Sequence, residues 1–391
     1  MMKRSFADIL QGLEGDRARK VSRKLPSWSA AGAEVPTALS LEQCSSEATA
    51  QYKAGLVSRT VSTPPETILD ITGGLGVDSW AFSQVAERVV YFERDAELAA
   101  AAARNFARLG AAGIEVRCET VTPQTELPEA DLIYADPARR SAAGRKVFLL
   151  EDCSPDILTL LPLLLRKAPA VLLKLSPMAD LSMLTERLGP ALHEIHVVEL
   201  DSEVKELLCL LRRDPTPEGP EIIIPRLDRS PSGPSVSHSG PPSHSGLDPE
   251  SLRFCPQEER DAMPQYAAAV RPGDTLLVPS PALLKAGAFN LPCARWGLQK
   301  LAPSTHLYLS PSLPGAAWFR PYRIREVLPV GNAAFRQLRE QYPKAEVTAR
   351  NLPLTSDALR KKLGIAPGGE AHIFACRLAD GAAVLLVCKK M

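Results

Sequence analysis

Short apolar runs alternate with helical patterns along the chain from Thr67 to about Arg212. We expect strands at residues 68–71, 88–92, 114–117, 131–135, 170–175, 193–199 and 206–212. Helical patterns separate most of these runs, notably Ala96 to Leu109 and Pro155 to Arg166. Strands that alternate with helices favour a doubly wound, mainly parallel sheet. The pattern therefore predicts an α/β, Rossmann-like domain over residues 65–213.

Two smaller α+β units are expected after this domain. The first, residues 272–312, has strand patterns at Thr275–Pro279 and Ser304–Leu309 around a short helix at Pro281–Ala288. The second, residues 320–391, is expected to contain strands at 322–328, 345–349, 372–378 and 383–388 and helices at 332–341 and 356–363.

The segment between these parts, residues 214–271, is expected to be a linker or insertion. Residues 228–250 within it are rich in Pro, Ser and Gly and contain a near repeat, at 237–241 and 243–247. Such a composition buries too little apolar surface to order itself, so this stretch is predicted to be disordered. Its histidines, His238 and His244, are expected to be solvated rather than metal ligands.

The distribution of charge is most informative in the C-terminal segment. The whole chain of 391 residues has 46 Lys and Arg against 45 Asp and Glu, so its net charge of +1 indicates no particular partner. Residues 320–391 contain thirteen Lys or Arg and six Asp or Glu, a net charge of +7. A positive surface attracts phosphate backbones, which favours a nucleic-acid partner; the alternative is a solvated surface with a charge skew.

Cysteine spacing and hydropathy exclude several classes of protein. The eight cysteines form no C-x-x-C pair and no Cys/His spacing suited to zinc, so we expect reduced thiols, no metal and a cytoplasmic protein. The charged start at Lys3 and Arg4 is unlike a signal peptide. The run Ile157–Leu165 is too short to span a bilayer and contains Pro162, so no membrane association is expected.

A glycine-rich turn follows the first predicted strand, at Gly73, Gly74 and Gly76, and a helical pattern begins at Asp78. Strand, glycine turn and helix bring backbone close to a nucleotide-like ligand. A dinucleotide fingerprint would need a third glycine where the chain has Ser79. A generic glycine turn of an α/β protein is the alternative interpretation.

Acidic residues accompany this turn. Asp70 ends the first predicted strand and Glu93 follows the second, which is the pattern of class I S-adenosylmethionine (SAM) methyltransferases. By this likeness Asp70 would face the amino group of the methionine moiety and Glu93 would hold both ribose hydroxyls. Glu119, after the third strand, would face the adenine amino group, or else is an exposed loop acid. The complete predicted cofactor set is Asp70, Thr72, Gly73, Gly74, Gly76, Asp78, Glu93, Arg94, Glu119 and Asp136.

The fourth predicted strand ends in Asp136-Pro137-Ala138-Arg139. Amino-group methyltransferases carry D/N-P-P followed by an aromatic residue at this place, where the acid and the prolyl carbonyl orient the target nitrogen. Here the aromatic residue is missing, although a guanidinium can also stack on a base or bind a phosphate. We therefore expect Asp136, Pro137 and Arg139 to face the methyl acceptor.

Two other residues are candidates near this place. Lys174, at the end of the next strand, could bind phosphate or polarise the acceptor, or be a lysine with a buried stem. Some uridine-carbon methyltransferases carry D-P-P-R and a nucleophilic cysteine after the next strand, where this chain has none. Cys153 is the nearby cysteine; it precedes a predicted helix whose dipole could lower its pKa, but a structural role is expected.

Residues 1–64 are predicted to be helical and rather basic, with seven Lys or Arg against three acids in residues 1–30. Residues 40–43 fit a capped helix start, and residues 43–53 continue at helical spacing. Such a region could cover a cofactor or contact substrate; equally, it could be a packing extension.

Over nearly its whole length the chain resembles bacterial class I SAM-dependent methyltransferases that end in a THUMP-like domain. The segments that carry the resemblance are 42–47 with 52–53, 70–78, 136–140, 150–156, 174–177, 203–206, 285–289 and 305–308. The resemblance implies a seven-stranded sheet with an antiparallel edge, a ferredoxin-like domain near 272–312 and a THUMP-like domain near 320–391. Since THUMP domains bind RNA, it also implies an RNA substrate, tRNA or rRNA. The insertion at 228–250 departs from the family.

The hypothesis from the sequence is thus a cytoplasmic enzyme that transfers a methyl group from SAM to an RNA base. Methyl transfer from a sulfonium needs proximity, alignment and, for a protonated nucleophile, a base. The alternatives are a protein or small-molecule methyltransferase, and a SAM- or RNA-binding module without turnover.

Overall fold

The computed structural model describes residues 6–61, 64–139, 150–216, 218–227, 251–310, 312 and 318–391, with side chains from Gly15 onward. These residues form two compact units. The first contains the chain up to Leu200 and Val204–Arg253; the second contains Asp201–Glu203 and Phe254–Met391. In the described part of the chain, no helix is both long enough and apolar enough to cross a membrane.

The first unit is built on a nine-stranded sheet with the order β11-β10-β8-β9-β7-β4-β1-β2-β3. Its strands are β1 (Thr67–Asp70), β2 (Arg88–Phe92), β3 (Ile114–Arg117), β4 (Leu132–Ala135), β7 (Ala170–Leu175), β8 (Leu192–Leu200), β9 (Glu203–Arg212), β10 (Glu221–Ile224) and β11 (Leu252–Phe254). β1 is parallel to both β2 and β4, and β9 is antiparallel to β7. The predicted α/β class and the Rossmann-like topology are confirmed. The expected antiparallel strand is present as β9, but it lies between β7 and β8 and not at the edge of the sheet.

Two strands of this sheet were not expected. β10 and β11 lie in the segment predicted to be a linker, so the sheet is wider than the seven strands that the resemblance implied. β10 pairs in parallel with β8, one of the two outermost of the seven predicted strands, and Ile222–Ile224 are buried. Tertiary pairing thus orders part of a segment whose composition suggested none; residues 228–250 lie outside the described residues.

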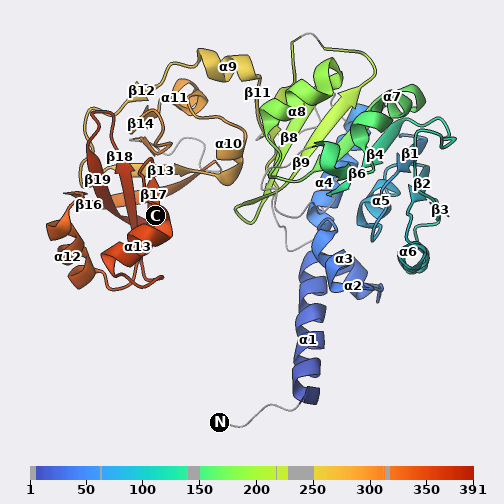
Figure 1. Cartoon of the computed structure of the whole chain (residues 1–391), viewed down its shortest axis with the longest axis horizontal. Coiled ribbons are helices and arrows are strands. Elements are labelled where there is room, and N and C mark those ends of the chain that lie inside the picture. Colours follow the sequence, from blue (N-terminus) through green and yellow to red (C-terminus); the bar gives the residue numbers. More distant parts are fainter. Residues whose placement is uncertain are drawn as a thin grey trace. The chain divides into compact units, whose positions relative to one another are not determined.

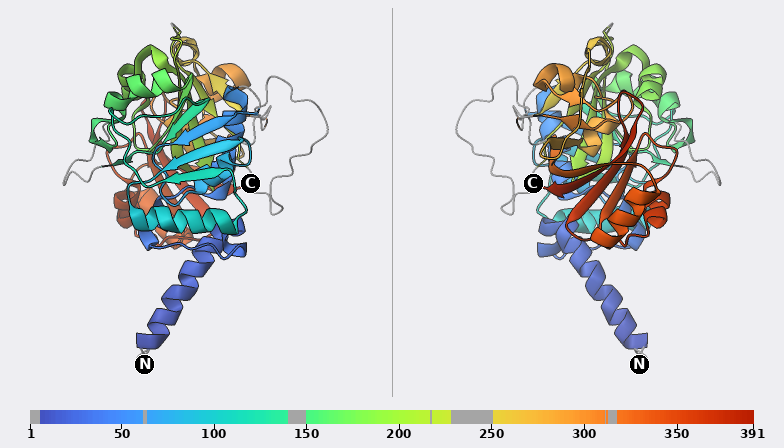
Figure 2. Two further views of the ribbon diagram at one scale, coloured as in Figure 1. Left: turned by 90° about the vertical axis from the view of Figure 1, so that its right-hand side faces the viewer. Right: turned by 90° about the vertical axis from the view of Figure 1, so that its left-hand side faces the viewer.

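Helices of the first unit precede and connect these strands. They are α1 (Phe6–Lys24), α2 (Pro26–Ala30), α3 (Ala38–Gln43), α4 (Glu47–Thr60), α5 (Val77–Phe82), α6 (Ala96–Arg108), α7 (Ile157–Lys167) and α8 (Leu181–Leu188). α1 projects away from the sheet, as Figures 1 and 2 show. The predicted helix start at Ser40 is wrong: Thr37 caps α3, and Ser46 caps a separate helix α4.

Helices α2, α3 and α4 pack on one face of the sheet. Trp28, Ala50 and Val57 are buried in one apolar cluster with Ile68 of β1 and Leu172 of β7. Alternate residues of the strands enter this cluster because successive side chains of a strand point to opposite faces. Helices α2 to α4 are therefore part of the core of the first unit and lie against the strands that bear the predicted site.

The second unit contains an eight-stranded sheet with the order β12-β14-β15-β13-β16-β19-β18-β17. Its strands are β12 (Gln265–Tyr266), β13 (Thr275–Pro279), β14 (Gln299–Lys300), β15 (Tyr308–Leu309), β16 (Phe319–Pro329), β17 (Glu346–Arg350), β18 (Ala371–Arg377) and β19 (Ala383–Lys390). Its helices are α9 (Pro256–Asp261), α10 (Pro281–Lys285), α11 (Leu291–Trp296), α12 (Asn332–Gln341) and α13 (Ser356–Leu363).

The two C-terminal segments expected from the sequence share this one sheet, because β13 pairs with β16 from Thr275 opposite Arg323 to Pro279 opposite Phe319. α12 and α13 bury Leu338 and Leu359 with one set of alternate strand residues, including Ile373. Phe374, the next residue of β18, belongs to the cluster on the opposite face. α9 and β12, in the predicted linker, also belong to this unit.

Candidate active site

The turn between β1 and α5 leaves no room for a side chain at two of its glycines. A Cβ on Gly73 would lie 2.0 Å from the Tyr91 ring, and one on Gly76 would lie 2.5 Å from the Phe106 ring. Gly76 also has a φ of 89°, a left-handed conformation that glycine adopts without strain. The turn, which follows the carboxyl end of β1, is thus packed tightly against β2 and α6.

Asp70 is buried at the end of β1, with 1% of its surface exposed. One carboxylate oxygen accepts a hydrogen bond from the backbone N–H of Thr72 (3.1 Å), and the other accepts one from the Ser79 hydroxyl (2.5 Å). Burial raises the pKa of Asp70 to about 7, and the nearby carboxylates of Asp78 and Asp136 add to this rise. A cation placed beside Asp70 would relieve this cost, since an opposite charge favours the ionised form.

Glu93 lies just after β2 and joins the glycine turn to the next loop. Its carboxylate accepts hydrogen bonds from the backbone N–H of Gly74 (2.9 Å) and of Asp95 (2.8 Å). The Tyr91 hydroxyl donates to the carbonyl of Gly74 (2.5 Å). These bonds fix the turn and place a half-buried carboxylate at the carboxyl end of the second strand.

Asp136 and Lys174 meet at the carboxyl ends of β4 and β7. The ammonium of Lys174 lies 2.5 Å from Asp136 Oδ2, and the backbone N–H of Asp136 donates to Thr72 Oγ1 (2.6 Å). Thr72 thereby connects this pair to Asp70. The side chain of Asp136 is 34% exposed and that of Lys174 11% exposed, so the carboxylate is the more accessible partner.

A buried group of charges lies behind this pair. Lys53 of α4, fully buried, forms ion pairs with Asp78 of α5 (3.1 Å) and Glu206 of β9 (2.7 Å). Asp78 also accepts hydrogen bonds from the hydroxyls of Ser45 and Tyr134, each at 2.8 Å. Burial alone would raise the pKa of Asp78, but Lys53 and Lys174 outweigh it and the pKa lies below the ordinary value. Asp78 is therefore an ionised structural anchor of α5.

Ser45, Lys53, Tyr134 and Glu206 were not among the predicted site residues. The sequence did contain a signal, because segments that carry the resemblance, 42–47 with 52–53 and 203–206, supply Ser45, Lys53 and Glu206. Only the fold shows that these distant segments converge on Asp78.

The remaining predicted residues lie further out. Arg94 and Glu119 are exposed in the loops after β2 and β3, and neither joins the hydrogen bonds above within the described residues. Pro137 is buried. Arg139 lies in β5 (Ala138–Arg139), and its side chain is not among those that the structure describes. Cys153 is buried in β6 (Cys153–Ser154), which pairs with β5, and not at the start of α7, which Asp156 caps.

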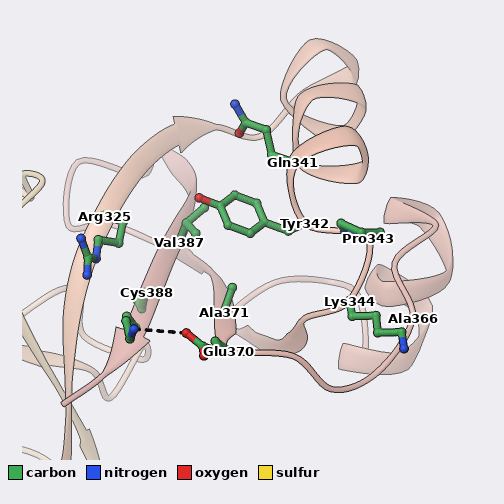
Figure 3. Close-up of a pocket in the computed structure, with 11 residues that line it drawn as sticks. Arg325, Gln341, Tyr342, Pro343, Lys344, Ala366, Glu370, Ala371, Val387 and Cys388 are labelled. Carbon is green, nitrogen blue, oxygen red and sulfur yellow. Dashed lines mark hydrogen bonds and ion pairs between the residues drawn. The ribbon is translucent and has the colours of Figure 1, made fainter.

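A separate groove of about 550 Å³ lies in the second unit, between the end of α12 and strands β16, β18 and β19. Tyr342, Val387 and Ala371 give it apolar surface, and Figure 3 shows the Tyr342 ring among these residues. Its cations are Arg325, Lys344 and Lys389, the last ion-paired with Glu370 at 3.1 Å. In the described parts of the chain, no group of His, Cys, Asp and Glu residues is suited to hold a metal ion.

Comparisons with known proteins agree with this architecture. Residues 319–390 match the THUMP domain-like family, and residues 276–315 match a ferredoxin-like domain family. A solved structure from Porphyromonas gingivalis W83, described as a "putative methyltransferase", is 33% identical with a TM-score of 0.80, and the match covers 96% of this chain and 88% of that one. The chain belongs to the same methyltransferase family. The resemblance predicted from the sequence motifs is thus confirmed.

Other solved structures match only part of the chain. An rRNA methylase from Streptococcus thermophilus is 10% identical over 41% of this chain and 93% of its own, with a TM-score of 0.32. A Streptococcus mutans protein described as a "putative methyltransferase", solved with S-adenosylhomocysteine, is 10% identical over 41% of this chain and 96% of its own, with a TM-score of 0.31. At these scores neither match bears on function. No curated protein matches the chain.

Proposed function

We propose that this methyltransferase uses SAM to methylate RNA. The observation that supports this most is the convergence of Asp70, the glycine turn and Glu93 at the carboxyl ends of β1 and β2, where α/β sheets bind ligands. The buried carboxylate of Asp70 suits the ammonium of the methionine moiety. Glu93 suits the ribose hydroxyls, and Arg94 and Glu119, in the loops after β2 and β3, are proposed to contact the adenosine.

The acceptor would lie beside Asp136. Its accessible carboxylate can accept a hydrogen bond from the acceptor, and Thr72 holds it next to the cofactor-binding turn. Lys174 remains a cation here, so it can stabilise negative charge that develops on the acceptor but cannot serve as a base. Pro137 and Arg139 extend this edge. When bound, SAM would supply the methyl group; the protein would supply alignment.

RNA is proposed as substrate because of the second unit. Residues 320–391 carry a net charge of +7, and the groove described above combines an aromatic ring, Tyr342, with Arg325 and Lys344. Unpaired bases of RNA stack on aromatic rings while cations bind phosphates. By this proposal the THUMP-like part positions tRNA or rRNA, and the protein works in the cytoplasm without a metal.

The test is transfer of a labelled methyl group from SAM to RNA isolated from a strain that lacks the gene. Wild-type protein should label tRNA or rRNA, and RNA binding should weaken steeply with salt. Asp136→Ala should retain SAM affinity within about tenfold but lose transfer. Labelling of protein or small molecules instead would make the substrate proposal wrong. RNA binding without any labelling would indicate a binding module.

A further inference from the structure

Two segments of the second unit that contributed to the resemblance, Lys285–Phe289 and Thr305–Tyr308, have no role in the proposed methyl transfer. The fold brings them together. The rings of Phe289 and His306 stack with centroids 4.0 Å apart and planes inclined by 23°. Lys300, almost fully buried, donates to Asn290 Oδ1 (2.9 Å), and its ammonium lies 5.9 Å from the centre of the Phe289 ring.

The turn that carries His306 lies against the end of β17. Thr305 Oγ1 donates to the carbonyl of Arg377 (2.6 Å) and accepts from Asn351 Nδ2 (3.5 Å). Thr305 and Asn351 are therefore hydrogen-bonded to each other, and His306 and Arg350 are the residues next to them in the sequence. His306 has a φ of 50° and Asn351 a φ of 54°, both in the left-handed region. Non-glycine residues held in this conformation cost free energy and cluster at ligand sites.

Polar atoms at this place lack partners. His306 Nδ1 and Arg350 Nε are both buried without a hydrogen-bond partner among the described residues. Buried polar atoms are almost always hydrogen-bonded, so two orphans on adjoining elements require an explanation. A ligand that accepts hydrogen bonds from both would satisfy them.

Charge indicates the kind of ligand. Burial lowers the pKa of Arg350, and the nearby Arg320 lowers it further, without a carboxylate that opposes the effect. Burial also lowers the pKa of His306 to about 4, and Lys300 and Arg350 contribute. The negative charge of Glu259 partly offsets the positive charge of Lys300. Within the described residues, Arg350 has no such anionic partner. A half-buried guanidinium without an anion is costly, so the missing partner is an anion.

We propose that His306 and Arg350 form a phosphate-binding site at the junction of the ferredoxin-like segment and β17. The guanidinium would donate to phosphate oxygens through Nε, and the neutral imidazole would donate through Nδ1, held in place by its stack on Phe289. The phosphate is either part of an RNA substrate, in which case the site rests on the proposed function, or a free phosphate or mononucleotide.

The experiment measures the melting temperature of the full chain with and without inorganic phosphate, at constant ionic strength. Phosphate should raise the melting temperature of the wild type, because a ligand that binds the folded state stabilises it. Arg350→Gln should lose this shift, whereas the exposed control Arg336→Gln should keep it. Without phosphate, Arg350→Gln should be at least as stable as the wild type, since it removes an unpaired cation. An unchanged phosphate shift in Arg350→Gln would overturn the proposal.

A second pair of variants tests the histidine. His306→Asn keeps a nitrogen donor and a residue that tolerates left-handed backbone, so it should retain part of the shift; His306→Ala should lose it. Equal shifts in the alanine variant and the wild type would contradict a role for Nδ1.

Filter binding of RNA over a range of salt then distinguishes the two sources. If the phosphate belongs to RNA, Arg350→Gln should reduce the slope of log K against log salt by about one. An unchanged slope with loss of the phosphate shift assigns the site to a free phosphate or mononucleotide. Since the phosphate shift needs no methyl transfer, failure of the proposed function would leave this result intact.

Discussion

The ammonium of Lys174 lies 2.5 Å from Asp136 Oδ2, and this ion pair joins the carboxyl ends of two adjacent parallel strands. Burial alone would lower the pKa of Lys174, but Asp136, Asp78 and Glu206 together raise it above the ordinary value. Lys174 is therefore a fixed cation at the edge of the sheet where the acceptor is proposed to lie.

Replacement of this cation should slow turnover without loss of the cofactor. We expect Lys174→Met to lower kcat by about 100-fold or more, because a preorganised charge at the reacting centre is removed. The Kd of S-adenosylhomocysteine, measured by calorimetry, should stay within about tenfold. Lys167→Met, which removes a partly exposed lysine at the end of α7, is the control. Turnover at the wild-type rate in Lys174→Met would exclude the proposed role.

Cofactor affinity should depend on pH through Asp70, whose pKa of about 7 lies above that of an unfolded aspartate. The fold therefore binds this proton more tightly, and the stability it contributes falls as pH rises from about 4 to 7. A ligand ammonium needs the ionised form, so affinity should change in the opposite direction. The Kd of S-adenosylhomocysteine should be about tenfold weaker at pH 6 than at pH 8.

The matched variant for this prediction is Asp70→Asn, which cannot ionise. It should bind S-adenosylhomocysteine weakly and with little difference between pH 6 and pH 8. If the wild type showed equal affinity at the two pH values, Asp70 would not be the partner of the ammonium.

The glycine turn should tolerate no side chain at Gly73. A methyl group there would overlap the Tyr91 ring, so Gly73→Ala should lower the free energy of unfolding by about 1–3 kcal/mol and weaken cofactor binding. Gly55→Ala, in the middle of α4, meets nothing closer than 3.4 Å and should be neutral or stabilising by up to about 1 kcal/mol. Chemical denaturation measures both; a Gly73→Ala variant as stable as Gly55→Ala would contradict the close packing.

Lys53 should be essential to stability. Lys53→Met leaves the carboxylates of Asp78 and Glu206 buried without their cation, so we expect a loss of about 3–5 kcal/mol in the free energy of unfolding. Arg88→Met, which breaks an exposed pair with Glu115, should cost less than about 1 kcal/mol.

The pH dependence of this loss provides its check. Because burial raises the pKa of Glu206, acid should neutralise the orphaned carboxylate, and the deficit of Lys53→Met should shrink as pH falls. A deficit that stays constant between pH 8 and pH 5 would mean that the cost comes from packing rather than charge.

Much of the fold could be predicted from the sequence. All seven strands expected between residues 68 and 212 form within two or three residues of their predicted bounds, since apolar runs and glycine turns are local signals. The same signals place Asp70, Glu93, Asp136 and Lys174 at strand ends, and parallel strands bring those ends to one edge.

The tertiary structure decided the rest, because it depends on contacts between distant segments. β10 is ordered by pairing with β8, although its surroundings in the sequence resemble a linker. The sequence predicts Asp78 as a cofactor residue, and only the fold shows that Lys53, Ser45 and Tyr134 from other elements contact its carboxylate. The orphaned nitrogens of His306 and Arg350 likewise appear only in the fold, since no local pattern shows which buried group lacks a partner.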